Sequence, residues 1–178
     1  EQPLDELAVS FFHSEGPIAR EFERYEHRPG QIEMAEGVAR SLEDEQFLLV
    51  EAGTGVGKSL AYLVPAILWA RSNGEPVLIS TNTKNLQEQL MGQDLPLLSR
   101  ALPIDFEAAL VKGRNNYLCV RRLLSLLREA RGSLFPEERA GAAYLASWAA
   151  TSGSGDLDAL PPEADQAFEG LRGMTDRI

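Results

Sequence analysis

The chain has 178 residues, of which 44% are hydrophobic and 25% charged, the size and composition of one ordinary globular domain. Its net charge of −10 argues against a protein that coats a polyanion over its whole surface. The single cysteine, Cys119, excludes a disulfide-rich secreted scaffold and favours a reducing compartment, for which we expect the cytoplasm. No apolar run approaches the ~20 residues of a membrane span, so we expect no membrane association.

The charge is unevenly distributed along the chain. Residues 1–51 carry a net charge of −9 and residues 133–178 one of −5, whereas residues 52–132 carry +4. The acidic groups therefore lie in the two flanks. The sequence also shows no basic leader and begins with Glu1, so we expect the chain to be a processed or excised piece.

Hydrophobic periodicity predicts alternating helices and strands in the first two thirds of the chain. The predicted helices are residues 4–12, 31–43, 60–69 and 83–98, and the predicted strands are residues 47–50, 77–80 and 106–111. This alternation indicates an α/β fold, a parallel sheet with flanking helices. Pro65 lies inside the third helix and predicts a kink or a local break there.

Beyond Tyr117 the pattern becomes helical only. Helices are predicted for residues 118–130 and 136–150, with a weaker one for residues 162–171. We therefore divide the chain into an α/β region, residues 1–116, and a helical region, residues 117–178.

A phosphate-binding loop follows the first predicted strand. The segment Glu51–Ser59, EAGTGVGKS, matches the P-loop pattern with Ala52 in place of the first glycine. Glycines let successive backbone N–H groups point at phosphate oxygens in front of a helix N-terminus. Lys58 would reach the β- and γ-phosphates of ATP, and the Ser59 hydroxyl would ligate Mg²⁺. The predicted nucleotide-binding residues are Ala52, Gly53, Thr54, Gly55, Val56, Gly57, Lys58 and Ser59.

A P-loop alone leaves several functions open. A stand-alone P-loop kinase or phosphotransferase would need an acceptor site and a lid with arginines that grip phosphate. A non-enzymatic nucleotide-binding module would use the acidic residues 1–51 as its contact surface.

Four segments in order carry a family resemblance. They are RPGQ at residues 28–31, EAGTGVGKS at 51–59, STNTKNLQEQL at 80–90 and KGRNNYLC at 112–119. In this order and spacing they resemble the DinG/XPD-like branch of superfamily 2 DNA helicases. The resemblance implies an ATP-dependent 5′→3′ DNA helicase that couples ATP binding and hydrolysis to translocation on single-stranded DNA, in repair or replication.

The resemblance also assigns regions of the fold. Residues 1–116 would be the N-terminal part of a RecA-like, P-loop NTPase helicase domain 1. Residues 117–178 would be the start of a helical insertion of the iron–sulfur type.

Two residues before the P-loop would contact the nucleotide. The resemblance implies that Gln31 reads the adenine edge with its amide and that Arg28 braces this region. Judged by itself, Gln31 is interpreted instead as a helix N-terminal residue that hydrogen-bonds backbone.

The resemblance also predicts a nucleic-acid contact after the second strand. The side chains expected to contact phosphates of single-stranded DNA are Thr81, Asn82, Thr83 and Lys84. Asn82 stands where members of the family often have histidine. The alternative is structural, because a threonine here would also serve as a helix N-cap.

Cys119 resembles the first of four cysteine ligands that hold a [4Fe-4S] cluster in this family. One thiolate cannot hold a cluster, and no second cysteine follows it here. The alternative is a buried small hydrophobic residue. The arginines that follow, predicted as a solvated basic face or as the wall of a DNA channel, are Arg121, Arg122, Arg128 and Arg131.

The acidic motif that ATP hydrolysis requires is not evident. Adjacent Asp-Glu pairs occur at Asp5-Glu6 and Asp44-Glu45, and neither ends an apolar strand. We therefore expect the 178 residues by themselves to have no helicase activity and negligible ATPase activity.

Overall fold

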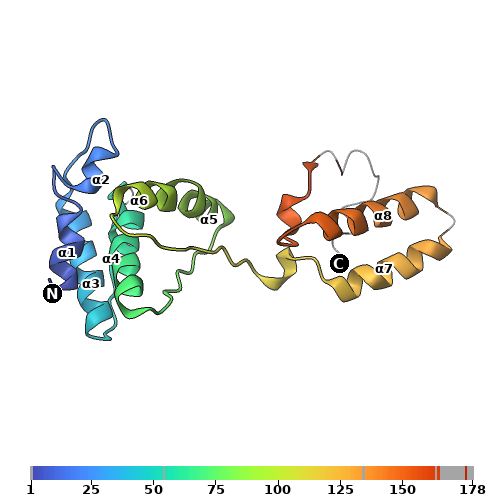
Figure 1. Cartoon of the computed structure of the whole chain (residues 1–178), viewed down its shortest axis with the longest axis horizontal. Coiled ribbons are helices and arrows are strands. Elements are labelled where there is room, and N and C mark those ends of the chain that lie inside the picture. Colours follow the sequence, from blue (N-terminus) through green and yellow to red (C-terminus); the bar gives the residue numbers. More distant parts are fainter. Residues whose placement is uncertain (1, 54, 134, 163, 165–174, 176–178) are drawn as a thin grey trace. The chain divides into compact units, whose positions relative to one another are not determined.

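The computed structural model describes residues 2–53, 55–133, 135–162, 164 and 175. The chain divides into two compact units, Glu1–Leu110 and Val111–Ile178 (Figure 1). Each unit has its own hydrophobic core. Among the described residues, no helix has the length and apolar character needed to cross a membrane.

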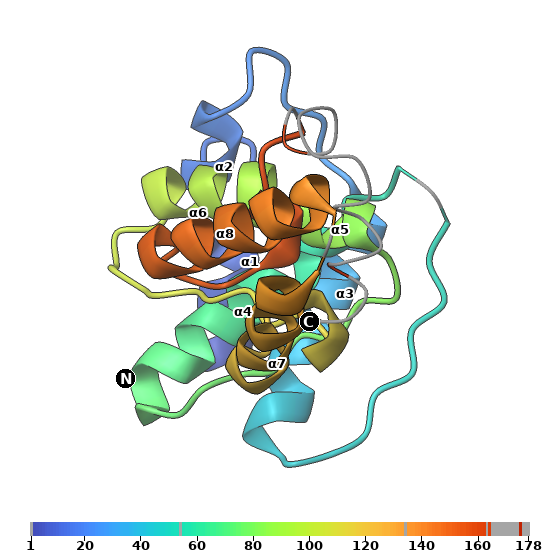
Figure 2. The same cartoon turned by 90° about the vertical axis from the view of Figure 1, so that its right-hand side faces the viewer.

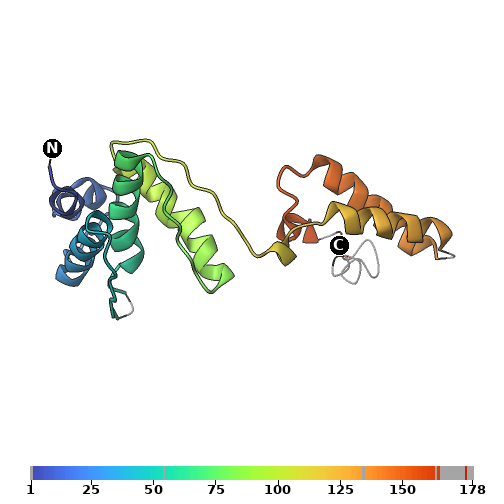
Figure 3. The same ribbon diagram turned by 90° about the horizontal axis from the view of Figure 1, so that it is seen from below.

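Three helices form the centre of the first unit. Helices α1 (Leu4–Ser10), α3 (Pro29–Glu43) and α4 (Lys58–Asn73) lie side by side (Figures 1 and 3). The short helix α2 (Pro17–Arg20) packs against α6 (Leu95–Ala101). The largest fully buried apolar side chains of this core are Phe12, Ile18, Leu63, Val64 and Leu98.

Helix α4 positions the P-loop, because it begins directly after it. Gly57 at its N-cap and Gly74 at its C-cap both have positive φ, +83° and +68°, which favours glycine at each end. Of the kink or local break predicted at Pro65, the break does not occur, since α4 continues through this residue. Pro65 removes one hydrogen bond to the Ala61 carbonyl, but its ring is fully buried, and we infer that packing offsets the loss.

The helix predicted at residues 83–98 is confirmed in a segmented form. Helix α5 (Lys84–Gln89) continues through a π-helical turn, η1 (Leu90–Asp94), into α6. Leu90 and Leu98 lie on the buried side of this segment and join the first core. The predicted helix 31–43 is also confirmed, as α3.

The parallel sheet is not confirmed. Residues 47–50, 77–80 and 106–111 have no regular secondary structure, and the described residues contain no strand ladder, only an isolated bridge between Tyr117 and Asp156. Phe47 and Leu49 are fully exposed, and Figure 2 shows the stretch between α3 and α4 as a long uncoiled trace. Local sequence favours extended backbone, but a strand also needs a neighbour for its N–H and C=O groups. None of these segments has such a neighbour within the part of the chain that is described.

The second unit is a helical pair. Helices α7 (Val120–Gly132) and α8 (Pro136–Thr151) lie side by side (Figures 1 and 3), confirming the helices predicted there. Single-turn helices η2 (Arg114–Asn116) and η3 (Leu157–Ala159) flank them. The helix predicted at 162–171 lies largely outside the described residues. The core consists of Leu123, Leu126, Ala130, Ala142, Leu145 and Ala164.

Candidate nucleotide site and nucleic-acid interface

The P-loop has the backbone shape of an anion-binding loop. Gly55 and Gly57 have φ of +81° and +83°, in the left-handed region that side chains rarely adopt. The loop leads directly into the 16-residue helix α4, whose N-terminal N–H groups favour an anion. A Cβ atom at Gly53 or Gly55 would meet no described heavy atom within 4 Å, so this side of the loop is open. Thr54 lies outside the described residues.

Lys58 folds back over the start of its own loop. Its Nζ donates to the carbonyl oxygens of Ala52 at 2.9 Å and Gly53 at 2.7 Å. The ammonium group is therefore held at the start of the loop, by the backbone of Ala52 and Gly53. Ser59, the predicted Mg²⁺ ligand, is half-buried in the first turn of α4.

Gln31 and Arg28 contact the P-loop itself. Gln31 is buried at 5% exposure, and its Nε2 donates to the Gly57 carbonyl oxygen at 2.9 Å. Arg28 donates from Nη1 to the Gly55 carbonyl oxygen at 2.6 Å, and from Nε and Nη2 to one carboxylate oxygen of Glu26 at 3.1 and 3.0 Å. Sequence reasoning missed Glu26, because an exposed glutamate two residues from an arginine carries no distinctive signal.

The two threonines predicted to contact DNA differ in their bonding. The Oγ1 of Thr83 accepts a hydrogen bond from the Leu86 N–H at 3.3 Å and caps α5, as the structural alternative predicts. The Thr81 hydroxyl is buried and has no hydrogen-bond partner within the described part of the chain. A buried hydroxyl without a partner lowers the stability of the fold. Asn82 and Lys84 are exposed.

Cys119 lies at the N-cap of α7 and is half-buried. Hydrogen bonding from the Arg122 backbone, followed by smaller contributions from Arg121 and Arg122, holds the pKa of its thiol below the ordinary value. No group of three His, Cys, Asp or Glu side chains that could hold a metal ion occurs among the described residues. A [4Fe-4S] cluster needs four ligands, so the residues present do not fit one.

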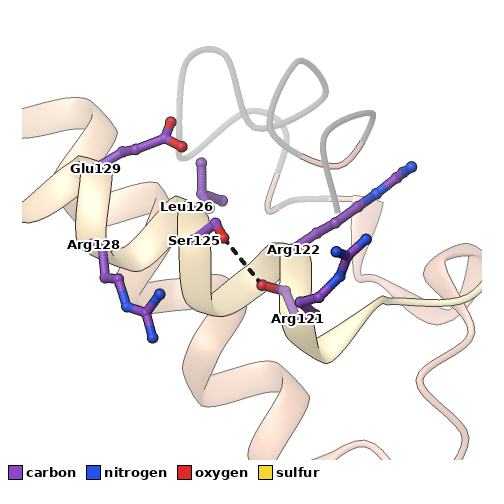
Figure 4. Close-up of a pocket in the computed structure, with 6 residues that line it drawn as sticks. All are labelled: Arg121, Arg122, Ser125, Leu126, Arg128 and Glu129. Carbon is purple, nitrogen blue, oxygen red and sulfur yellow. Dashed lines mark hydrogen bonds between the residues drawn. The ribbon is translucent and has the colours of Figure 1, made fainter.

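The basic face of α7 borders a shallow pocket. Arg121, Arg122 and Arg128 project from this helix (Figure 4), and the Ser125 hydroxyl donates to the Arg121 carbonyl oxygen at 3.3 Å. The pocket has a volume of about 490 Å³, and its described lining residues are Arg121, Arg122, Ser125, Leu126, Arg128 and Glu129.

The KGRNNYLC segment has a structural role that the sequence did not reveal. The Nζ of Lys112 donates to carboxylate oxygens of Asp156 at 2.6 Å and Asp158 at 2.9 Å, and the Lys112 side chain is only 12% exposed. The Lys112 N–H also donates to the Tyr117 hydroxyl at 2.9 Å. These bonds hold the pKa of Lys112 well above its usual range. The two aspartates are 44 and 46 residues away in sequence, so no local signal predicts them.

Comparisons with known proteins identify relatives named DinG and YoaA, two of them named as helicases and one as an exonuclease. The chain is 43% identical to the "ATP-dependent helicase DinG" of Mycobacterium tuberculosis over 151 residues, covering 76% of this chain and 23% of the relative. It is 38% identical to the "ATP-dependent DNA helicase YoaA" of Escherichia coli over 156 residues, covering 88% and 24%. It is 39% identical to the "3'-5' exonuclease DinG" of Bacillus subtilis over 105 residues, covering 59% and 11%.

These relatives confirm the resemblance to DinG-like helicases that the four motifs carry. The chain spans only about a quarter or less of their length. The family model described as "DEAD/DEAH box helicase" matches residues 29–124, more than half of the chain, and it includes the P-loop and the Thr81 segment. The chain therefore belongs to the DEAD/DEAH box helicase family, which implies a P-loop NTPase fold.

Proposed function

We propose that this chain is the ATP-binding part of an ATP-dependent DNA helicase that translocates 5′→3′ on single-stranded DNA. The observation that carries the proposal is the P-loop, in which left-handed Gly55 and Gly57 precede α4 and Lys58 lies beside the loop. The names of the DinG and YoaA relatives support the activity. Family membership favours it over a stand-alone kinase or a non-enzymatic module.

The chain's own residues would bind and orient the triphosphate of ATP. Backbone N–H groups of the loop and the N-terminus of α4 would hold the phosphate oxygens. The Lys58 ammonium would exchange its bonds to the Ala52 and Gly53 carbonyls for bonds to the β- and γ-phosphates. The Ser59 hydroxyl would ligate Mg²⁺, which neutralises phosphate charge when bound.

The proposed DNA contact centres on the exposed side chains of Asn82 and Lys84, which would contact neighbouring phosphates. The Thr81 hydroxyl is buried, so it would gain a phosphate acceptor only through a movement of this segment on binding. The Thr83 hydroxyl is used by the α5 cap, so we assign it mainly a structural role. Arg121, Arg122 and Arg128 on α7 would supply a second, independent set of phosphate contacts.

The proposed function also assigns the two regions. Residues 1–116 would belong to the N-terminal part of a RecA-like helicase domain 1. Residues 117–178 would begin a helical insertion of the iron–sulfur type, in which the single cysteine present here could supply at most one ligand.

The nucleotide half of the proposal is tested by Lys58→Ala. Binding of a fluorescent ATP analogue with Mg²⁺ is measured by titration, and binding of labelled oligo-dT by fluorescence anisotropy. We expect Lys58→Ala to raise the Kd for nucleotide roughly 10-fold or more, since a charge-assisted contact is lost. Arg71→Ala, which removes an exposed cation from the same helix α4, is the control. Unchanged nucleotide affinity in Lys58→Ala would contradict the P-loop assignment.

The DNA half is tested by comparing oligo-dT with a duplex hairpin of equal phosphate number. We expect tighter binding of oligo-dT, and we expect Lys84→Ala to weaken it and to lower the slope of log K against log salt by about 0.7. Equal affinity for the two oligonucleotides would contradict the preference for single strands.

A further inference from the structure

The helical segment after the proposed DNA contact changes its winding between α5 and α6 (Figure 1). The Leu90 N–H donates to the Leu86 carbonyl oxygen, four residues earlier, whereas the Leu95 N–H donates to that of Leu90, five residues earlier. The second bond is the pattern of a π turn. A side-chain bond spans the same turn, since Nε2 of Gln89 donates to a carboxylate oxygen of Asp94 at 3.2 Å. Residues five apart lie about 140° apart around an α-helix, so this bond depends on the π winding.

The two sides of this turn are held very differently. On the C-terminal side, Leu98 and Ala101 of α6 are buried in the first core, and Nε of Arg100 donates to a carboxylate oxygen of Glu21 at 2.9 Å. On the N-terminal side, α5 has no buried residue, and its one apolar side chain, Leu86, is 44% exposed. A segment with few buried contacts opens locally at low cost in free energy. Helix α5 can therefore move while α6 stays in the core.

We propose that η1 is the joint about which α5 moves when single-stranded DNA binds. The inference rests on the proposed DNA contact at residues 82–84 and adds a conformational step to it. In the free protein, the bond between Gln89 and Asp94 holds η1 in its π winding. DNA binding selects the moved position of α5, in which the segment before this helix offers contacts that the free protein lacks.

The segment before α5 supports the same movement. The Thr81 hydroxyl is buried and has no hydrogen-bond partner within the described part of the chain, so a phosphate oxygen reaches it only if this segment moves. Thr83 joins the segment to α5, because its Oγ1 accepts the cap bond from the Leu86 N–H. A movement of α5 about η1 therefore carries the Thr81 segment with it.

Gly92 gives the joint its conformational freedom. It is exposed in the middle of η1, and a Cβ atom built on it would meet no described heavy atom within 4 Å outside its own helix. Glycine has the greatest backbone freedom of all residues and lowers the stability of a helix, and hinges are often built from such small residues. Because alanine fits here without a clash, Gly92→Ala changes the backbone freedom of the joint and little else.

The first test is amide hydrogen exchange of the 178-residue chain, followed by mass spectrometry with and without oligo-dT. In the free protein we expect residues 84–90 to exchange faster than residues 95–101. Oligo-dT should slow exchange in residues 90–94 at least 2-fold and leave residues 95–101 unchanged. Residues 90–94 are the informative segment, because the proposed contact at residues 82–84 does not include them.

Two variants should shift DNA binding in opposite directions. Gly92→Ala makes the joint stiffer, so we expect slower exchange in α5 and η1 by about 4-fold, from the difference in helix propensity, and a Kd for oligo-dT raised by up to the same factor. Gln89→Met removes the bond to Asp94, so exchange should become faster and the Kd about 2-fold lower. Gly132→Ala, at an exposed helical glycine of α7 with equally open surroundings, is the matched control.

Thermal unfolding of each variant establishes that binding is measured on folded protein. Shifts of Kd in the same direction in Gly92→Ala and Gln89→Met, or no shift in either, would overturn the inference. If the wild type bound oligo-dT with unchanged exchange in residues 90–94, the DNA contact would stand and the joint would be wrong. If the wild type bound no oligo-dT, the proposed DNA contact would be wrong and the inference would fall with it.

Discussion

Thr81 and Thr83 should respond in opposite directions to the same substitution. The Thr81 hydroxyl is buried without a partner in the described part of the chain, and such a group costs about 1–3 kcal/mol. Thr81→Val removes the hydroxyl and keeps the shape, so we expect unit 1 to gain about 1 kcal/mol in free energy of unfolding. Thr83→Val removes the cap of α5, whose bond is long at 3.3 Å, and should cost about 0.5–1 kcal/mol.

The assay must report on the first unit alone. The chain has two tryptophans, Trp69 in α4 and Trp148 in α8. In a Trp148→Phe background, urea unfolding followed by tryptophan fluorescence reads out unit 1. Equal m values for the two variants would show that the difference in midpoint is a difference in stability.

DNA binding supplies the second readout. Thr81→Val should weaken oligo-dT binding by roughly 3- to 10-fold, because the contact with phosphate is lost while the fold becomes more stable. A Thr81→Val protein less stable than the wild type would show that the hydroxyl has a partner in the free protein. A more stable protein with unchanged DNA affinity would refute the assignment of Thr81 to the nucleic-acid interface.

Three further predictions concern packing and charge. Leu145→Ala truncates a fully buried side chain and should destabilise unit 2 by about 2–5 kcal/mol, measured by urea unfolding, while leaving nucleotide affinity unchanged. Reduced ATP affinity would show that nucleotide binding depends on the packing of unit 2. Lys112→Met should destabilise unit 2 by roughly 1–2 kcal/mol, because Asp156 loses its cation in a part-buried setting; a more stable unit 2 would be the contrary result. Arg40 holds the pKa of Asp5 below its ordinary value of 3.8, so this contribution to stability is present above that pH and is lost as pH falls through the lowered pKa. Asp5→Asn should make the free energy of unfolding of unit 1 depend less on pH in the acid range. An unchanged pH dependence would show that the Asp5–Arg40 pair does not contribute to it.

Much of the local structure could be predicted from the sequence because its causes are local. Apolar spacing at residues 31–43 predicts α3, and the glycines of residues 53–57 predict a phosphate loop before α4. The missing N–H of Pro65 does not break α4, and the burial of its ring could not be read from the local sequence.

Whether the apolar segments pair into a sheet could not be predicted from local sequence. Residues 47–50 and 77–80 have the apolar composition of strands, but pairing depends on a neighbouring strand that is distant in sequence, and none occurs in the described residues.

The sequence by itself determined the family motifs, the helices and the identity of the P-loop residues, since each depends on residue type at short spacing. Only the tertiary structure decided which distant groups the long side chains contact. It placed the Gln31 amide on Gly57, 26 residues away, and Lys112 on Asp156, 44 residues away, and it left the Thr81 hydroxyl without a partner in the described chain. Hydrogen bonds and burial depend on which segments meet in space, and a sequence pattern does not contain that information.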